Sequence, residues 1–272
     1  SNRLRMVGVN GMRRLSESEA LARIAEAAAA FHHVTNLNSL RHAERISFWV
    51  NVYNTLSVHA NAVYRPTTLR ERLHAQLYYK YKIGNDTFSM AEISLFLLRA
   101  TLPASRQLER LFRERIEWRK KGVVLSGALL SPEPMLTFAL NDGTPACAEI
   151  VAYWPDNIEE QLRAAARRYF ARLFRVDRKE KRALLPRYLS WIRRDFGRTR
   201  DERIAMLGDL MEPDQRRALF ECGKRASGIK YTCNDQTLGF ACPISKKSRS
   251  KDKNSSSSRV AKSQRVRRSI SK

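Results

Sequence analysis

The sequence predicts an α+β fold in which a helical N-terminal half packs on a small, mainly antiparallel sheet. Helical periodicity of apolar residues runs through residues 16–31 and 43–64. Two β-prone runs flank the turn Gly84-Asn85-Asp86, and the chain lacks the regular alternation of strands and helices that a parallel sheet requires.

Capping motifs and apolar stripes place the first helices. Ser16 and Glu19 form a Ser-x-x-Glu capping box, after which Leu21, Ile24, Ala28 and Phe31 share one helical face. The segment from Ala43 to Tyr64 predicts a second, more apolar helix that ends at Arg65-Pro66. Its expected core stripe is Trp49, Val52, Leu56, Ala60 and Val63.

The middle of the chain predicts a hairpin followed by a helix. Leu77 to Ile83 is aromatic and β-prone, and Thr87-Phe88 resumes an extended run after the turn. Ser89 and Glu92 form another capping box. The helix that it opens carries Ile93, Phe96, Leu97 and Ala100.

The second half of the chain predicts mixed elements. Met135 to Leu140 indicates a buried strand that runs into the loop 141–145. Asp156 is the expected cap of a helix, and a shorter helix ends at Gly197. The first helix carries Ile158, Leu162, Ala165, Tyr169 and Leu173, the second carries Leu189, Ile192 and Phe196, and extended runs follow at Ile229–Thr232 and Thr237–Phe240.

Length and composition indicate a globular domain with a tail. The 272 residues are 43% hydrophobic, which is enough for a substantial core. We expect an N-terminal helical extension over 1–39, a globular domain over 40–242 and a disordered basic tail over 243–272. No signal peptide or transmembrane segment is recognisable, which predicts an intracellular, cytoplasmic or nuclear protein with reduced thiols. The first residue is Ser, as in a fragment of a longer chain.

The formal net charge of +24 is unevenly distributed. Eleven lysines and arginines against one aspartate lie between Lys246 and Lys272, so this tail carries +10 and the body +14. The tail has the composition of a nuclear-import signal or an electrostatic anchor, and an inert solubilising tail is the alternative. Nucleic acid or an anionic membrane are candidate partners for such charge.

Two polar stripes lie on predicted helices. Ser47, Asn51, Asn54 and Asn61 recur at helical spacing, and either tie the helix to a neighbouring loop or line a cleft. Exposed arginines recur on the helix after Asp156, and either contact phosphate groups or form a solvated face. They are Arg163, Arg167, Arg168, Arg172 and Arg175.

Five segments, in order, resemble a known family. They are Phe48 to Leu56, Tyr81 to Ser89, Phe138 to Thr144, Tyr153 to Leu162, and Ser190 to Gly197. Together they are similar to the signature of the family called domain of unknown function 547. The resemblance implies an unassigned activity, and it connects the fold to papain-like cysteine hydrolases.

The departures from this family bear on catalysis. Asp86 and Thr137 stand where the family usually has His, and Asp142 stands where it has Cys. Cys147 is the only nearby thiol and matches a second Cys of many bacterial members. A thiol enzyme needs a thiolate beside an imidazole, and His59 or His42 are the candidates for pairing with Cys147.

The sequence therefore predicts a non-catalytic interaction or scaffold domain, with a protein partner, a degenerate cleft and no cofactor. The alternatives are a Cys147–His59 thiol hydrolase or redox protein, and an electrostatic binder of nucleic acid or anionic membrane. Asp86 and Asp142 are too few to predict a metal site. Ser47, Asn51, Tyr53, Asn54, Asp86 and Asp142 are the expected polar residues of the cleft.

Overall fold

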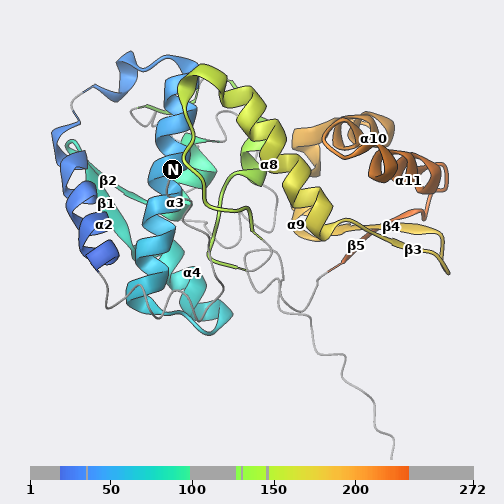
Figure 1. Cartoon of the computed structure of the whole chain (residues 1–272), viewed down its shortest axis with the longest axis horizontal. Coiled ribbons are helices and arrows are strands. Elements are labelled where there is room, and N and C mark those ends of the chain that lie inside the picture. Colours follow the sequence, from blue (N-terminus) through green and yellow to red (C-terminus); the bar gives the residue numbers. More distant parts are fainter. Residues whose placement is uncertain (1–18, 35, 99–126, 130, 145–146, 233–272) are drawn as a thin grey trace, which may run out of the picture.

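The α+β class is confirmed by a computed structural model that describes residues 19–34, 36–98, 127–129, 131–144 and 147–232. The expected capping residue Ser16, the run 237–240, Cys233, Cys242 and the tail 243–272 lie outside the described residues. Figure 1 shows two regions, one around helix α3 and one around the strands β3 to β5, with helix α8 between them.

The first region is built around α3 (His42–Tyr64), whose predicted bounds are confirmed to within one residue. Trp49, Val50 and Leu56 are fully buried because the helix has neighbours on several sides. These neighbours include α2 (Glu19–Ala29), α4 (Leu69–Tyr78), the short α5 (Met90–Glu92) and α8 (Ile158–Leu173). The helix ends at Arg65, which adopts a left-handed conformation before Pro66.

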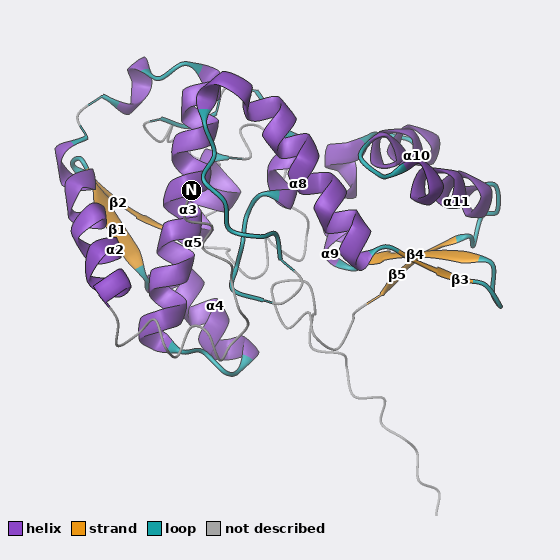
Figure 2. Cartoon of the chain, viewed as in Figure 1, coloured by secondary structure: helices purple, strands orange, loops and turns teal. Residues whose placement is uncertain are grey.

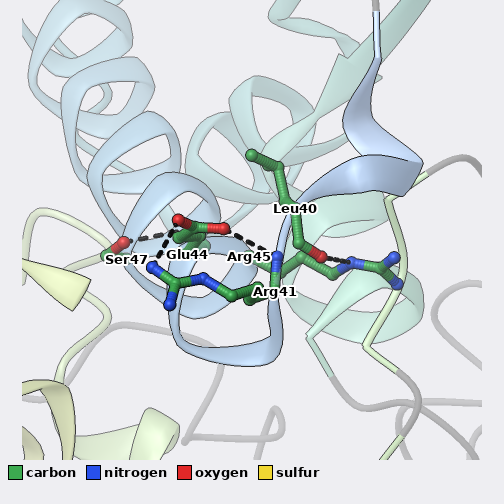
Figure 3. Close-up of polar contacts among 5 residues, drawn as sticks. All are labelled: Leu40, Arg41, Glu44, Arg45 and Ser47. Carbon is green, nitrogen blue, oxygen red and sulfur yellow. Dashed lines mark hydrogen bonds and ion pairs between the residues drawn. The ribbon is translucent and has the colours of Figure 1, made fainter. Parts of the chain in front are cut away.

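Arginine side chains fix the start of α3. The Glu44 carboxylate accepts the Arg41 backbone N–H at 2.7 Å and a guanidinium N–H at 2.8 Å (Figure 3). Arg45 donates to the carbonyl oxygens of Leu40, Asn38 and Ala128. These bonds satisfy backbone groups near the helix terminus and tie it to the segment around residue 128.

The predicted hairpin is confirmed as the antiparallel strands β1 (Lys80–Ile83) and β2 (Asp86–Ser89). Leu77 and Tyr78 belong to α4 instead of the strand, so the expected start was wrong. The Ser89–Glu92 capping box is confirmed, and the helix continues as a π-helical turn over Ile93–Leu97. A 3₁₀ helix over Ala30–His33 packs on the hairpin, where Gly84 N donates to Phe31 O at 3.0 Å.

The predicted strand over Met135–Leu140 is wrong, because Pro134–Phe138 forms a 3₁₀ helix. Pro134 lies in its first turn and the Glu133 carboxylate accepts the Met135 N–H at 3.1 Å, so local capping overrides the apolar run. The predicted cap at Asp156 is also wrong. Asp156 lies within a 3₁₀ turn over Pro155–Asn157, and α8 begins at Ile158.

The second region is a three-stranded sheet covered by helices (Figure 2). Strands β3 (Arg175–Asp177) and β4 (Arg182–Pro186) are antiparallel, whereas β4 and β5 (Ile229–Thr232) are parallel. The helix predicted to end at Gly197 is two shorter turns, α9 (Tyr188–Trp191) and the 3₁₀ helix Arg193–Phe196. Helices α10 (Arg200–Asp209) and α11 (Pro213–Gly223), which we did not predict, pack together beside this sheet.

One continuous apolar core joins the two regions. Trp49 and Phe138 belong to it on the α3 side, and Leu185 and Leu219 on the sheet side. In the part of the chain that the structure describes, no helix is both long and apolar enough to cross a membrane.

Candidate functional site

Two asparagines of α3 hold the segments that carry the candidate site. The Asn54 amide donates to Ala139 O at 3.0 Å and accepts the Asn141 N–H at 2.9 Å. The Asn51 amide binds both the carbonyl oxygen of Tyr153, at 2.8 Å, and its N–H, at 2.9 Å. Each side chain therefore pairs with backbone as another peptide group would, which is the structural role that we considered for them.

The loop over residues 141–144 begins at Asn141, which Asn54 binds, and it is closed by two short-range hydrogen bonds. Asn141 Oδ1 accepts the Gly143 N–H at 2.7 Å, and Asp142 Oδ1 accepts the Thr144 N–H at 3.0 Å. Gly143 has φ +83°, and a Cβ at this position would lie 2.3 Å from Asn61 Nδ2. The loop is therefore pressed against the C-terminal half of α3.

This loop presents a carboxylate to the thiol of Cys147. Cys147 Sγ donates to Asp142 Oδ1 at 2.6 Å and lies 3.1 Å from Thr144 Oγ1. Burial of the sulfur and the negative charge of Asp142 raise the pKa of the Cys147 thiol far above its usual value. The arrangement therefore favours the protonated thiol, which is a poor nucleophile.

Other buried groups around the thiol are also held neutral. Burial, followed by the charge of Asp142, raises the pKa of Tyr53 well above its usual value, while a hydrogen bond with Gln76 opposes this shift. Burial likewise raises the pKa of Tyr169 on α8. Gln76 is only 3% exposed, and its Oε1 atom has no hydrogen-bond partner. The sequence analysis did not assign Gln76, Thr144 or Tyr169 to the site. Only Gln76 carries a local signal, because it is a polar residue among apolar neighbours.

The structure does not bring His59 to this thiol. His59 Nδ1 lies 2.8 Å from the Tyr81 hydroxyl on β1, and the ring packs edge-on against Tyr79. Residues on a helix advance by about 100° each, so His59 and Asn61 point to nearly opposite sides of α3. Because Asn61 contacts the Gly143 loop, the imidazole of His59 faces away from that loop.

The other candidates also lie apart from the thiol. His42 begins α3, 19 residues and about 28 Å of helix away from Asn61. Asp86 is exposed at the start of β2, and Ser47 is buried, with its hydroxyl donating to Glu44 O of its own helix. Among the described residues, no group of three or more His, Cys, Asp or Glu side chains could hold a metal ion.

The arginines predicted on α8 are exposed. Arg163, Arg167, Arg168 and Arg172 all lie at the surface of this helix. Arg172 donates to Cys147 O, and Arg168 Nε lies 3.9 Å from Glu149 Oε2. We call the residues around the Cys147 thiol, which are Tyr53, Asp142, Thr144 and Tyr169, the thiol cluster. Helix α8 therefore supplies Tyr169 to this cluster and positive charge to the adjoining surface.

The part of the chain that carries this geometry matches a known protein family. The profile of the family described as "Protein of unknown function, DUF547" matches residues 37–170, which contain α3, the hairpin, the Asp142 loop and most of α8. No curated protein and no solved structure matches the chain. The papain-like architecture therefore stays a prediction. The chain belongs, through residues 37–170, to the DUF547 family of proteins of unknown function.

Proposed function

We propose that this protein is a non-catalytic interaction domain, a pseudoenzyme that has kept the family's scaffold without a working thiol. The observation that carries the proposal is the 2.6 Å hydrogen bond from Cys147 Sγ to Asp142. A nucleophilic cysteine needs a nearby cation or imidazole to stabilise its thiolate. Cys147 instead faces a carboxylate, which stabilises the thiol.

The position of Asp142 strengthens this proposal. By resemblance, Asp142 occupies the place where the family usually has a Cys. Its carboxylate holds the remaining thiol and also caps the loop through Thr144 N. We infer that the substitution converts a potential reactive centre into a structural contact.

The partners follow from charge. We infer a protein partner, because exposed arginines on α8 offer charged contacts beside the thiol cluster. We also propose an intracellular location, cytoplasmic or nuclear. The basic tail from residue 243 onward would be the localisation signal. Attachment of the tail to nucleic acid or an anionic membrane is the alternative, and strong salt dependence would identify it.

The test is turnover of an activated ester, p-nitrophenyl acetate, by the purified chain and its Cys147→Ala variant. We expect both proteins to hydrolyse the ester at the same background rate. Cys222→Ala is the matched control, because Cys222 is a second described free thiol and lies in α11. A rate above background that Cys147→Ala abolishes and Cys222→Ala preserves would overturn the proposal in favour of a thiol hydrolase.

A further inference from the structure

An open pocket of about 300 Å³ lies between the segment that follows Cys147 and the surface of α8. Its apolar part comes from small side chains and one aromatic ring, and its charged part from two arginines and one glutamate. The lining residues are Ala148, Glu149, Ala165, Arg168, Tyr169, Ala171 and Arg172. A concave site with an apolar lining and a few convergent charges is the usual form of a binding site.

The two arginines of the pocket are held differently. Arg172 donates to the backbone carbonyl of Cys147, which fixes its guanidinium at the pocket. Arg168 Nε is 3.9 Å from Glu149 Oε2, beyond hydrogen-bond distance, and both side chains are substantially exposed. Such an exposed pair contributes little stability, so another carboxylate can replace Glu149 at small cost.

A buried donor lies in the same neighbourhood. The Tyr153 hydroxyl has no hydrogen-bond partner, and the residue is 1% exposed. Burial raises the pKa of Tyr153 to about 12, and the positive charge of Arg168 acts against this shift. The surroundings of Arg168 therefore contain one unsatisfied donor as well as a weakly paired guanidinium.

We infer that this pocket binds a glutamate or aspartate side chain from an acidic segment of a partner protein. Arg168 and Arg172 bind the carboxylate as planar, bidentate donors, and Ala165, Ala171 and Tyr169 surround its methylene groups. Glu149 occupies the Arg168 side of this site in the free protein. The inference rests on the proposed interaction function and names the class of partner.

Charge complementarity favours an acidic partner. The body of the chain carries +14, and the neighbouring arginines of α8, Arg163 and Arg167, are exposed. These charges attract an acidic segment over distances of about 10 Å at moderate salt. The pocket then selects a carboxylate with a short aliphatic stem, because its lining is mostly small and apolar.

The test measures binding of a short fluorescein-labelled peptide of alternating glutamate and serine by anisotropy. We expect Arg168→Ala and Arg172→Ala each to weaken binding about tenfold. Arg167→Ala is the matched control on the same helix, outside the pocket, and should change the affinity less than about twofold. Ala171→Trp fills the pocket without changing charge, and should abolish binding.

A second pair of variants tests the displacement of Glu149. Glu149→Gln should tighten peptide binding about threefold, whereas Glu160→Gln, an equal change of charge on an exposed residue of α8, should change it less. Unchanged thermal unfolding would show that the variants remain folded.

Three outcomes would overturn the inference. The first is an equal loss in Arg167→Ala and Arg168→Ala, and the second is normal binding by Ala171→Trp, because each would indicate general attraction between charges. The third is that an oligothymidylate of equal charge binds and that each substitution changes its affinity as it changes the affinity for the peptide. That result would assign the pocket to nucleic acid. Cys147-dependent turnover would overturn the proposed function and leave these binding results standing, so the two failures can be distinguished.

Discussion

The two faces of α3 have different chemistry, although both carry polar side chains. On one face, Asn54 binds the backbone that leads into the Asp142 loop, and Asn61 lies against this loop, whose Asp142 carboxylate binds the thiol of Cys147. On the opposite face, His59 binds the Tyr81 hydroxyl of the hairpin. A thiol and an imidazole are therefore both present near one helix, but the helix itself separates them. The presence of reactive residue types says little about catalysis when helical geometry directs them apart.

The largest expected effect comes from removing Asn54. Asn54→Ala leaves the Ala139 carbonyl and the Asn141 N–H without partners in a buried place, at about 1–3 kcal/mol for each group. We expect the free energy of unfolding, measured by urea denaturation, to fall by about 3 kcal/mol. Asn51→Ala should cost less because Asn51 is only half-buried. If Asn54→Ala lowers the free energy of unfolding by less than about 1 kcal/mol, the two hydrogen bonds of Asn54 do not hold the loop.

Gly143→Ala should produce the next largest effect. A side chain at φ +83° is strained, and its Cβ would meet the Asn61 amide at 2.3 Å. We expect a loss of about 2 kcal/mol in urea denaturation. The matched test is the double variant Gly143→Ala with Asn61→Ala. Removing the Asn61 amide should restore the stability lost to the steric contact, but not the stability lost to backbone strain. Strict additivity of the two substitutions would argue against close packing of the loop on α3.

The opposite face should respond independently. Tyr81→Phe removes the hydroxyl that bonds His59, and we expect a loss of about 1 kcal/mol in the free energy of unfolding. The same variant should leave the alkylation rate of Cys147 unchanged. A change in thiol reactivity would mean that the two faces communicate, contrary to the separation described above.

The smallest expected effect is a pH dependence due to His59. Burial lowers the pKa of His59, so the folded protein disfavours the charged imidazole. Below the usual histidine pKa of about 6.5 the unfolded chain binds a proton that the folded protein binds less readily, so stability falls as the pH falls. Urea denaturation between about pH 7.5 and pH 5.5 should show a smaller decrease in the free energy of unfolding for His59→Gln than for the unmodified protein. An equal decrease in both proteins would contradict this account.

Much of the first region was predictable, because its signals are local. The apolar stripe from Ala43 to Tyr64 gave α3 to within one residue, and the turn Gly84-Asn85-Asp86 gave the hairpin. The same capping signal could have found two missed helices. Thr68 and Glu71 cap α4, and Thr199 and Glu202 cap α10, each through reciprocal side-chain bonds to backbone.

The site was less predictable, because it depends on tertiary contacts. Cys147 and Asp142 are five residues apart in the sequence, and their contact depends on a loop that Asn54 binds and that lies against Asn61. Periodicity placed His59 on the same helix as Asn51, but the hairpin that receives its ring is not specified by that periodicity. The strand predicted over 135–140 failed for a local reason, since an apolar run with Pro134 and the Glu133 cap prefers a 3₁₀ turn.

The most direct test of the central claim is the pH profile of Cys147 alkylation by iodoacetamide, followed at this residue by mass spectrometry. We expect slow modification, with no inflection in the rate below the usual thiol pKa of about 8.5. Asp142→Asn removes the opposing charge and should move the profile to lower pH. An inflection near neutral pH that disappears in His59→Gln would show a thiolate–imidazole pair, and would contradict the separation of thiol and imidazole by α3.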